Sequence, residues 1–271
     1  MIFGRKIPCG NRNFHRGFCF MNTSDSNFFG TEKVSRILLK IAPPVMLAQL
    51  IQALYNIVDS LFVGKYSESG LTALSIIYPL QLLMIAIAVG TGVGINTAMA
   101  HYLGVHDEKK ANEYGGIGTP LTLVLWVLFA LICFLFMPAY ARMSTDSPEV
   151  IKDVIVYGRI VCVFSIGLFT ESIWTKILQA NGDMRTPMIA QIVGALVNIA
   201  LDPLFIFGMF GLPKLGIAGA AIATVVGQIV AALIVMRKGF CKSPQYSAGI
   251  KLCAFIFVSN HISATLFISS L

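Results

Sequence analysis

The chain has 271 residues, of which 56% are hydrophobic and only 12% are charged, and its mean hydropathy is +0.77. Soluble globular domains carry about 25% charged residues, so this composition excludes that class. The net charge of +7 alone would suggest a nucleic-acid partner, but the distribution of the basic residues along the chain indicates membrane topology instead. We therefore expect a polytopic membrane protein.

Six apolar stretches are long enough to cross a bilayer, because a transmembrane helix needs about 20 mainly apolar residues. They lie near residues 41–63, 76–98, 117–138, 156–178, 188–208 and 215–236. These long continuous runs lack the alternation that the strands of a membrane barrel show over about ten residues. The predicted fold is all-α, a polytopic transmembrane bundle of six helices.

The six spans divide the chain into three parts. Residues 1–30 carry Arg and Lys but lack the apolar core of a signal peptide, so we interpret them as a disordered tail or as sequence upstream of a true start at Met21. Residues 31–238 form the six-helix unit. Residues 239–271 form an atypical tail whose hydrophobic segment, near 252–271, is weakened by the polar residues Ser259, Asn260, His261 and Ser263.

The basic residues are divided unequally between the two sides of the predicted bundle. If the N-terminus is inside, the connections near 101–116 and 179–187 and the segment after Arg237 are cytoplasmic. Five of the 20 Lys and Arg residues then belong to the outer side, namely Lys65, Arg142, Lys152, Arg159 and Lys214. The other fifteen belong to the inner side, as the positive-inside rule predicts. We expect a multi-pass protein of the cell (plasma) membrane that contacts the lipid bilayer and no nucleic acid.

Three of the 13 acidic residues, Asp59, Glu171 and Asp202, fall inside predicted spans. A charged carboxylate at the centre of a membrane helix costs about 2.5–3.5 kcal/mol on insertion scales. Such residues therefore face a bundle interior or a water-filled cavity and are functional candidates.

The neighbours of the two aspartates form matching polar stripes. Spacings of three, four and seven place residues on one helical face. The first span carries Gln52, Tyr55, Asn56 and Asp59 at these spacings, and the fifth carries Gln191, Gly194, Asn198 and Asp202. Both aspartates lie four to six residues short of the outer end of their span, which is about 6–9 Å at 1.5 Å per residue. They are predicted to share one chamber.

Pro203 directly follows the second aspartate. Its ring cannot donate to the carbonyl oxygen of Ile199, so we expect a bend that exposes backbone oxygen beside Asp202. Two close carboxylates and a free carbonyl suit a proton or a small cation. The other interpretation is that each aspartate only makes an interhelical hydrogen bond.

The predicted cation site comprises Asp59, Asn198 and Asp202, with H⁺ or Na⁺ as the ion. Candidates for the lining of the transport pathway are Gln52, Tyr55, Asn56, Glu171, Ser172, Gln191 and Thr224. No other metal site and no cofactor are expected, since the six cysteines are scattered and form no metal-binding pair.

Small residues at four-residue spacing indicate close helix packing. Gly90 and Gly94 form one such pair, and Gly219, Ala223 and Gly227 form a series in the sixth span.

Two segments carry a family resemblance, "LLKIAPPVMLAQLIQALYNIVDSLFVGKYSESGLTALSIIYPL" and "ILQANGDMRTPMIAQIVGALVNIALDPLFIFGMFGLPKLGIAGAAIAT". In residue identity and spacing, the chain resembles the multidrug and toxic compound extrusion (MATE) family from about Phe29 to Lys238. The resemblance implies a secondary antiporter of two six-helix lobes, of which this chain would be the first. It also implies that the cation site of that lobe uses Asp59, Asn198 and Asp202.

The function expected from these observations is cation-coupled export of organic, cationic compounds, with this chain as the N-terminal lobe. A second lobe or self-association would complete the transporter. Alternatives are a truncated, non-transporting membrane domain and a flippase of a lipid-linked precursor. We expect no enzymatic activity, because the aspartates lack the Tyr-Asp and Gly-x-Gly-Asp settings of intramembrane aspartyl proteases.

Overall fold

The computed structural model describes residues 34–208 and 214–242. The tail predicted at 1–30 and the weak hydrophobic segment near 252–271 lie outside these residues. Seven helices, and no strand, occur in the described part: α2 (Val34–Tyr66), α3 (Glu68–Gly104), α4 (Glu108–Ser144), α5 (Pro148–Val163), α6 (Ile166–Ala180), α7 (Arg185–Phe207) and α8 (Ile217–Lys242).

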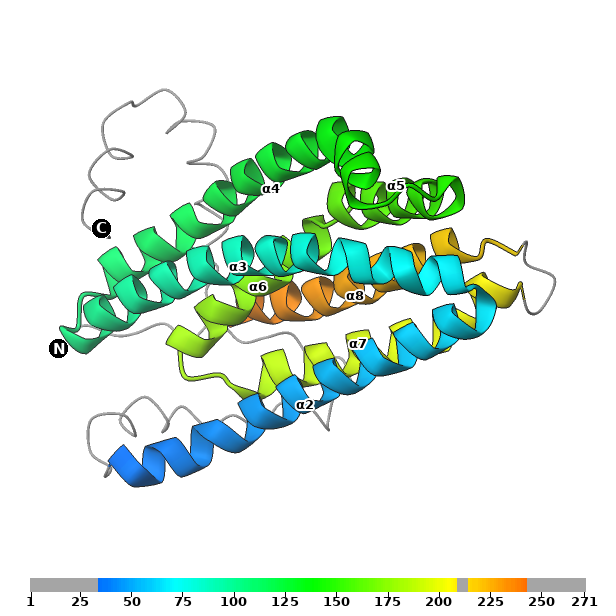
Figure 1. Cartoon of the computed structure of the whole chain (residues 1–271). Helices are drawn as coiled ribbons and strands as arrows, with labels where there is room; N and C mark the ends of the chain where they lie inside the picture. Colours follow the sequence, from blue (N-terminus) through cyan, green and yellow to red (C-terminus); the bar gives the residue numbers. More distant parts are fainter. Residues whose placement is uncertain (1–33, 209–213, 243–271) are drawn as a thin grey trace, which may run out of the picture.

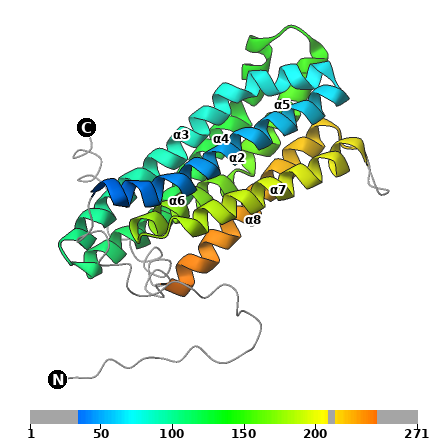
Figure 2. The ribbon, with the colours of Figure 1, turned by 90° about the horizontal axis from the view of Figure 1, so that it is seen from below.

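The helices run roughly antiparallel to one another along a single direction (Figure 1). α3, α6 and α8 form the middle of the bundle, with α4 and α5 on one side and α2 and α7 on the other (Figures 1 and 2). The connections at Ser67 and at 145–147, the end of α7 and the start of α8 lie at what we call the Ser67 end. Connections at 105–107 and 181–184 lie at the opposite, Asp107 end.

Five of the described helices are long and apolar enough to cross a membrane, and α5 and α6 add a sixth span if the bent pair is counted as one. Large apolar side chains on the outside of α2, α3 and α4 are exposed, including Leu54, Leu82 and Leu131. A soluble protein would not expose so extensive an apolar surface. The all-α, multi-span membrane fold predicted from the sequence is therefore confirmed.

The fourth span, predicted over 156–178, consists of two helices and not one. It breaks between α5 and α6, which are bent by 40°. Carbonyl groups freed at a break must find donors inside the protein, since lipid offers none. Here Ser165 Oγ donates to Cys162 O at 2.7 Å, and Trp126 Nε1 of α4 donates to Val163 O at 3.2 Å. The two carbonyl groups at the bend therefore both receive a hydrogen bond.

The helices extend beyond the apolar runs at the Asp107 end, where the sequence predicted a polar connection over 101–116. α3 continues to Gly104, and α4 begins at Glu108 after a three-residue turn. The Asp107 side chain accepts from Lys110 N at 3.1 Å and caps α4. Tyr102 and Tyr114 stack across the turn with ring centroids 5.1 Å apart. Apolar length marks the part of a helix in lipid, not the end of the helix.

Close packing occurs at only some of the glycines predicted to provide it. A Cβ on Gly227 of α8 would lie 2.7 Å from the carbonyl oxygen of Gly194 on α7, so the two backbones are in contact. Gly219 packs equally tightly on Phe205. The expectation is wrong for Gly90 and Gly94, where an added Cβ would meet no non-local heavy atom of the described chain within 4 Å. The four-residue spacing does not show which face of a helix is covered.

Candidate functional site

The polar stripe of α2 lines a pocket of about 310 Å³ between α2 and α3. Its four predicted members all contribute: Gln52, Tyr55, Asn56 and Asp59. The floor comes from α5, α6 and α8. The Asp59 side chain is buried, at 7% exposure, although it lies on the most peripheral helix of the bundle. The stripe therefore points into the protein, as the helical spacing predicted.

The polar stripe of α7 is buried against α8. Asn198 Nδ2 donates to Thr224 Oγ1 at 3.3 Å, and Thr224 in turn donates to Ala220 O at 3.0 Å. This chain fixes the Asn198 amide with its oxygen free to accept. Asp202, one turn further along α7, is fully buried. Gly194 and Gly227 let the two helices approach closely enough for the Asn198–Thr224 contact.

The three predicted cation-site residues present buried oxygen atoms without donors. Within residues 34–208 and 214–242, Asp59 Oδ1, Asn198 Oδ1 and both carboxylate oxygens of Asp202 receive no hydrogen bond. Asp59 lines the 310 Å³ pocket, whereas Asp202 is not among the residues that line it. That the two carboxylates share one chamber therefore stays a prediction.

Leaving these acceptors without a donor has a cost in free energy. A buried acceptor left without a donor costs about 1–3 kcal/mol, and more when it is charged. A proton between the carboxylates, or a small hard cation on the four oxygens, would remove both this cost and the repulsion between the two acids. Unpartnered carboxylate and amide oxygens are the kind of acceptors that a proton or a small monovalent cation takes.

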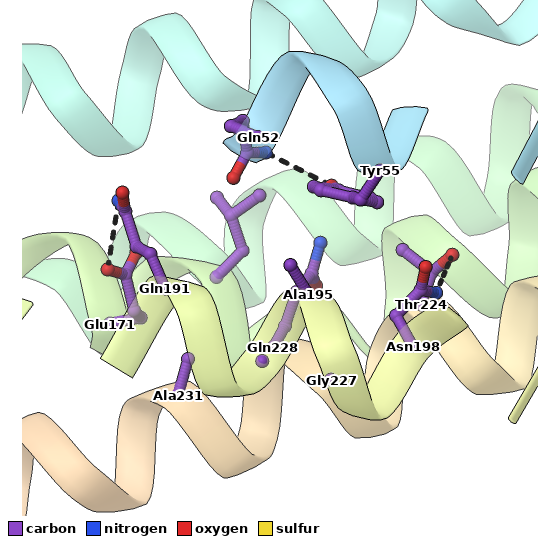
Figure 3. Close-up of a pocket in the computed structure, with 12 residues that line it drawn as sticks. Gln52, Tyr55, Glu171, Gln191, Ala195, Asn198, Thr224, Gly227, Gln228 and Ala231 are labelled. Carbon is purple, nitrogen blue, oxygen red and sulfur yellow. Dashed lines mark hydrogen bonds between the residues drawn. The ribbon is translucent and has the colours of Figure 1, made fainter. Parts of the chain in front are cut away.

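A second polar region lies further toward the Asp107 end, around a cavity of about 70 Å³ (Figure 3). Glu171 of α6 and Gln191 of α7 approach each other on one side of it, and Gln52 and Tyr55 of α2 lie above them. Gln191 Nε2 donates to Glu171 Oε1 at 3.5 Å, and Gln52 Nε2 donates to the Tyr55 hydroxyl at 3.0 Å. Asn198 and Thr224 line the other side of the same cavity.

A third cavity, of about 110 Å³, continues in the same direction. Glu171 and Gln191 line it as well, together with Ser172. Ser172 Oγ is buried and has no partner among the described residues. The predicted pathway residues therefore do not form a single chamber. Thr224 and the α2 stripe border Asp59, whereas Ser172 lies beyond Glu171 on the other side.

Sequence reasoning missed several polar residues of the pocket beside Asp59, among them Gln81, Tyr157 and Gln228. Gln81 Nε2 donates to the Tyr157 hydroxyl at 3.3 Å, and Gln228 Oε1 is buried without a donor in the described chain. The available signal was a polar side chain inside an apolar run. Gln81 and Gln228 carry this signal as single residues that belong to neither polar stripe.

Pro203 does not interrupt α7, so the bend expected there does not break the helix. Only one backbone hydrogen bond is lost at a proline, and the surrounding packing holds the last turn in place. Gly219 packs on Phe205, and Leu215 N donates to Phe205 O at 3.1 Å. The Ile199 carbonyl still lacks its usual donor, because proline has no N–H.

Comparison with known proteins places this geometry in a family. The sequence model of the MatE family matches residues 44–204, which include α2 from its second proline onward and nearly all of α7. The chain belongs to the MatE family.

Two curated MatE relatives show how much of a family member the chain represents. It is 32% identical over 194 residues to the probable multidrug resistance protein YoeA of Bacillus subtilis, covering 71% of this chain and 42% of that protein. It is 27% identical over 201 residues to an FAD transporter of Shewanella oneidensis, covering 73% of this chain and 44% of that protein. The chain spans less than half the length of these two relatives.

A solved MatE-like structure agrees in fold. An outward-facing multidrug resistance MATE transporter of the MOP superfamily superimposes with a TM-score of 0.76 and 26% identity. The match covers 83% of this chain and 49% of that protein. The described bundle therefore corresponds to about one lobe of a MATE transporter.

Proposed function

We propose that the chain is one lobe of a cation-coupled exporter of organic compounds, located in the plasma membrane with its N-terminus in the cytoplasm. H⁺ or Na⁺ would bind at Asp59, Asn198 and Asp202, and no cofactor would take part. The observation that carries this proposal is the set of four buried, donor-free oxygens on those three residues. The names of YoeA and of the solved neighbour, both multidrug transporters, support an organic substrate.

The substrate would bind beside the cation site. The pocket of about 310 Å³ that contains Asp59 reaches the lower end of the range for small-molecule sites, about 300–1,000 Å³. It lies between α2 and α3, and a second lobe or a second copy would complete it. A carboxylate in its wall would favour an organic cation over a neutral compound. Asp59 then belongs to both sites, which is how one ligand would exclude the other.

Coupling follows from this shared residue. Loading of one monovalent cation lowers the negative charge of the Asp59 and Asp202 pair by one unit, so a bound organic cation is held less strongly and is released. Loading of the organic cation from the other side favours loss of the small cation. Alternating access by movement of two lobes around a site near the midplane would convert this exchange into export.

The test is competition on the purified chain in lipid nanodiscs, with binding of the fluorescent cation ethidium as the readout. We expect saturating Na⁺, or lowered pH, to weaken ethidium binding by about tenfold, within the usual range of coupling between sites. Asp202→Asn should make ethidium binding insensitive to both ions, and Asp59→Asn, which also removes the counter-charge of the organic cation, should weaken ethidium binding itself. Asp146→Asn, in the exposed α4–α5 turn, is the matched control and should behave as wild type.

Two results would contradict the proposal: wild-type binding that ignores both ions, or an Asp202→Asn variant that responds as wild type does. Ethidium efflux from cells that express the chain adds a separate measurement. Efflux would show that the lobe works through self-association, whereas intact competition without efflux would show that it needs a different second lobe.

A further inference from the structure

Glu171 is a membrane-embedded carboxylate that the proposed coupling site does not use. It lies on α6, and its hydrogen-bond partner Gln191 precedes Asp202 by 11 residues on α7. At 1.5 Å per residue this is about 16 Å along the helix axis, so Glu171 belongs to a different part of the lobe.

The surroundings of Glu171 orient it without neutralising it. Thr175 Oγ1 donates to Oε1 at 2.9 Å, and Gln191 Nε2 donates to the same oxygen at 3.5 Å. In the part of the chain that the structure describes, Oε2 receives no hydrogen bond, and no Lys, Arg or His nitrogen lies within 4.0 Å of the carboxylate. One oxygen is held in place, and the other is free to bind a ligand.

The charged and titratable groups around it are few. On its own helix, Lys176 attracts the carboxylate electrostatically, but the ammonium donates to Gln179 Oε1 at 3.2 Å. From α2, the Tyr55 hydroxyl interacts electrostatically with Glu171. The residues of α7 and α8 that line the adjacent cavity are neutral, among them Gln191 and Gln228. Lys176 is therefore the nearby positive charge, and it does not pair directly with Glu171.

The space beside Glu171 sets the size of the ligand. The carboxylate lines both the 70 Å³ and the 110 Å³ cavities. These are volumes open to the centre of a water-sized sphere, of which roughly 10–15 Å³ holds one water, so each cavity holds several waters. Both are far below the roughly 300 Å³ at which sites for drug-sized molecules begin. A small cation with one or two waters fits, and an organic substrate does not.

We propose that Glu171 is a second binding group for a monovalent cation in this lobe, separate from the site at Asp59 and Asp202. The ion is a proton or Na⁺, held by Glu171 Oε2 with the side-chain oxygens of Gln52 and Gln191 beside it. The inference rests on the proposed function only in taking the coupling ion to be one of these two.

The cavities also connect the two sites. The 110 Å³ and 70 Å³ cavities share Glu171 and Gln191, and the 70 Å³ cavity shares Gln52, Tyr55 and Thr224 with the pocket beside Asp59. A continuous series of polar side chains thus runs from Gln179, near the Asp107 end, to Asp59. The second group thus lies on a polar route that leads to the pocket beside Asp59.

The experiment is direct cation binding to the purified full chain in nanodiscs, in two arms. The first counts bound ²²Na⁺ per chain at saturation. The second records infrared difference spectra during a pH titration and follows the carbonyl stretch of protonated carboxylic acids. Glu171→Gln is the main variant, since its amide oxygen can still accept from Thr175 and Gln191 and the fold should be preserved.

Loss of one bound Na⁺ in Glu171→Gln supports the proposal with Na⁺ as the ion. Loss of one protonated-acid band, with the Na⁺ count unchanged, supports it with a proton. The proposal is overturned when Glu171→Gln leaves both the count and the spectrum as in wild type. Glu113→Gln, an exposed glutamate of α4, is the control and should change neither.

Two further variants separate this inference from the coupling site and from a folding defect. Asp202→Asn should leave the Glu171 signal in place, so either site can fail independently of the other. Glu171→Asp keeps the carboxylate on a shorter side chain and should retain the signal with affinity lowered severalfold. A Glu171→Asp variant that folds but has no signal at any pH or Na⁺ concentration would equally contradict binding by this carboxylate.

Discussion

Asp202 contributes more unpaired oxygen atoms to the proposed cation site than Asp59 or Asn198 does. It is fully buried, and both of its carboxylate oxygens lack a hydrogen-bond donor in the described chain. A ligand that binds only the folded state stabilises it by RT ln(1 + [L]/Kd), about 2.7 kcal/mol at one hundred times Kd. If Asp202 binds the coupling ion, the folded lobe must become more stable as that ion is added.

We therefore predict that Na⁺ or acid raises the unfolding temperature of the wild type and that Asp202→Asn removes the larger part of this increase. The fluorescence of Trp174, which is buried at 1% exposure, is a suitable reporter of unfolding. Asn198→Asp, which adds a third acid to the chamber, should make the ion dependence steeper. An Asp202→Asn variant with the full wild-type response would exclude Asp202 as a ligand.

At the residue scale, the sequence was sufficient to select Asp59, Asn198 and Asp202 and to place them on helical faces. The reason is physical, since a polar group in an apolar span must face the interior. The sequence could not show that Thr224 fixes the Asn198 amide, because that contact joins residues 26 positions apart on two helices. It also could not distinguish the 310 Å³ pocket from the two smaller cavities.

At the scale of elements, the contact between α7 and α8 positions the cation site. A Cβ at Gly227 would lie 2.7 Å from the Gly194 carbonyl oxygen and 3.2 Å from the Asn198 Cβ. Backbone cannot move aside as a flexible side chain can. The separation of these two helices therefore depends on glycine at both positions.

We predict that Gly227→Ala destabilises the chain by about 1–3 kcal/mol, the usual cost of overpacking. Gly90→Ala is the matched control, since its Cβ would meet no heavy atom within 4 Å, and alanine is favoured over glycine in a helix by about 0.5–1 kcal/mol. Unfolding in denaturant with both variants measures the difference. Equal effects of the two substitutions would show that the α7–α8 contact is looser than described.

The break between α5 and α6 shows where prediction from sequence reached its limit for the elements. Residues 156–178 are apolar enough for a continuous span, and only Ser165 and Gly167 in the middle could have indicated a kink. What fixes the break is tertiary. A Cβ at Gly167 would lie 2.8 Å from Ile229 N of α8, and Trp126 of α4 reaches the freed Val163 carbonyl. Neither contact is visible along one helix.

At the scale of the whole molecule, the bundle is a membrane-embedded unit with two chemically different ends. Its central helix α8 has 56% of its most apolar window buried, against 11% for α2 at the edge. α2 nevertheless carries Asp59 and one of the two polar stripes. The proposed coupling site therefore combines residues of the central helix α8 with residues of α2 and α7 at the side of the bundle.

The charge distribution of the whole chain predicts the orientation of the bundle in the membrane. The excess of basic residues on one side predicts that the Asp107 end is cytoplasmic and the Ser67 end faces outward. Alkaline phosphatase is active only outside the cytoplasm. Fusion after Asp146 should therefore give high activity, and fusion after His106 should give almost none. The reverse pattern would show that the whole bundle is inverted.

The turn between α3 and α4 has a practical consequence for watching this lobe move. Each of these helices has 37 residues and is about 55 Å long, well beyond the roughly 30 Å of hydrocarbon in a bilayer. The turn that joins them has only three residues. The Asp107 cap and the stacked Tyr102 and Tyr114 rings restrict its motion. A spin label at Lys109 would therefore report the tilt of the α3–α4 hairpin and not the motion of a flexible loop.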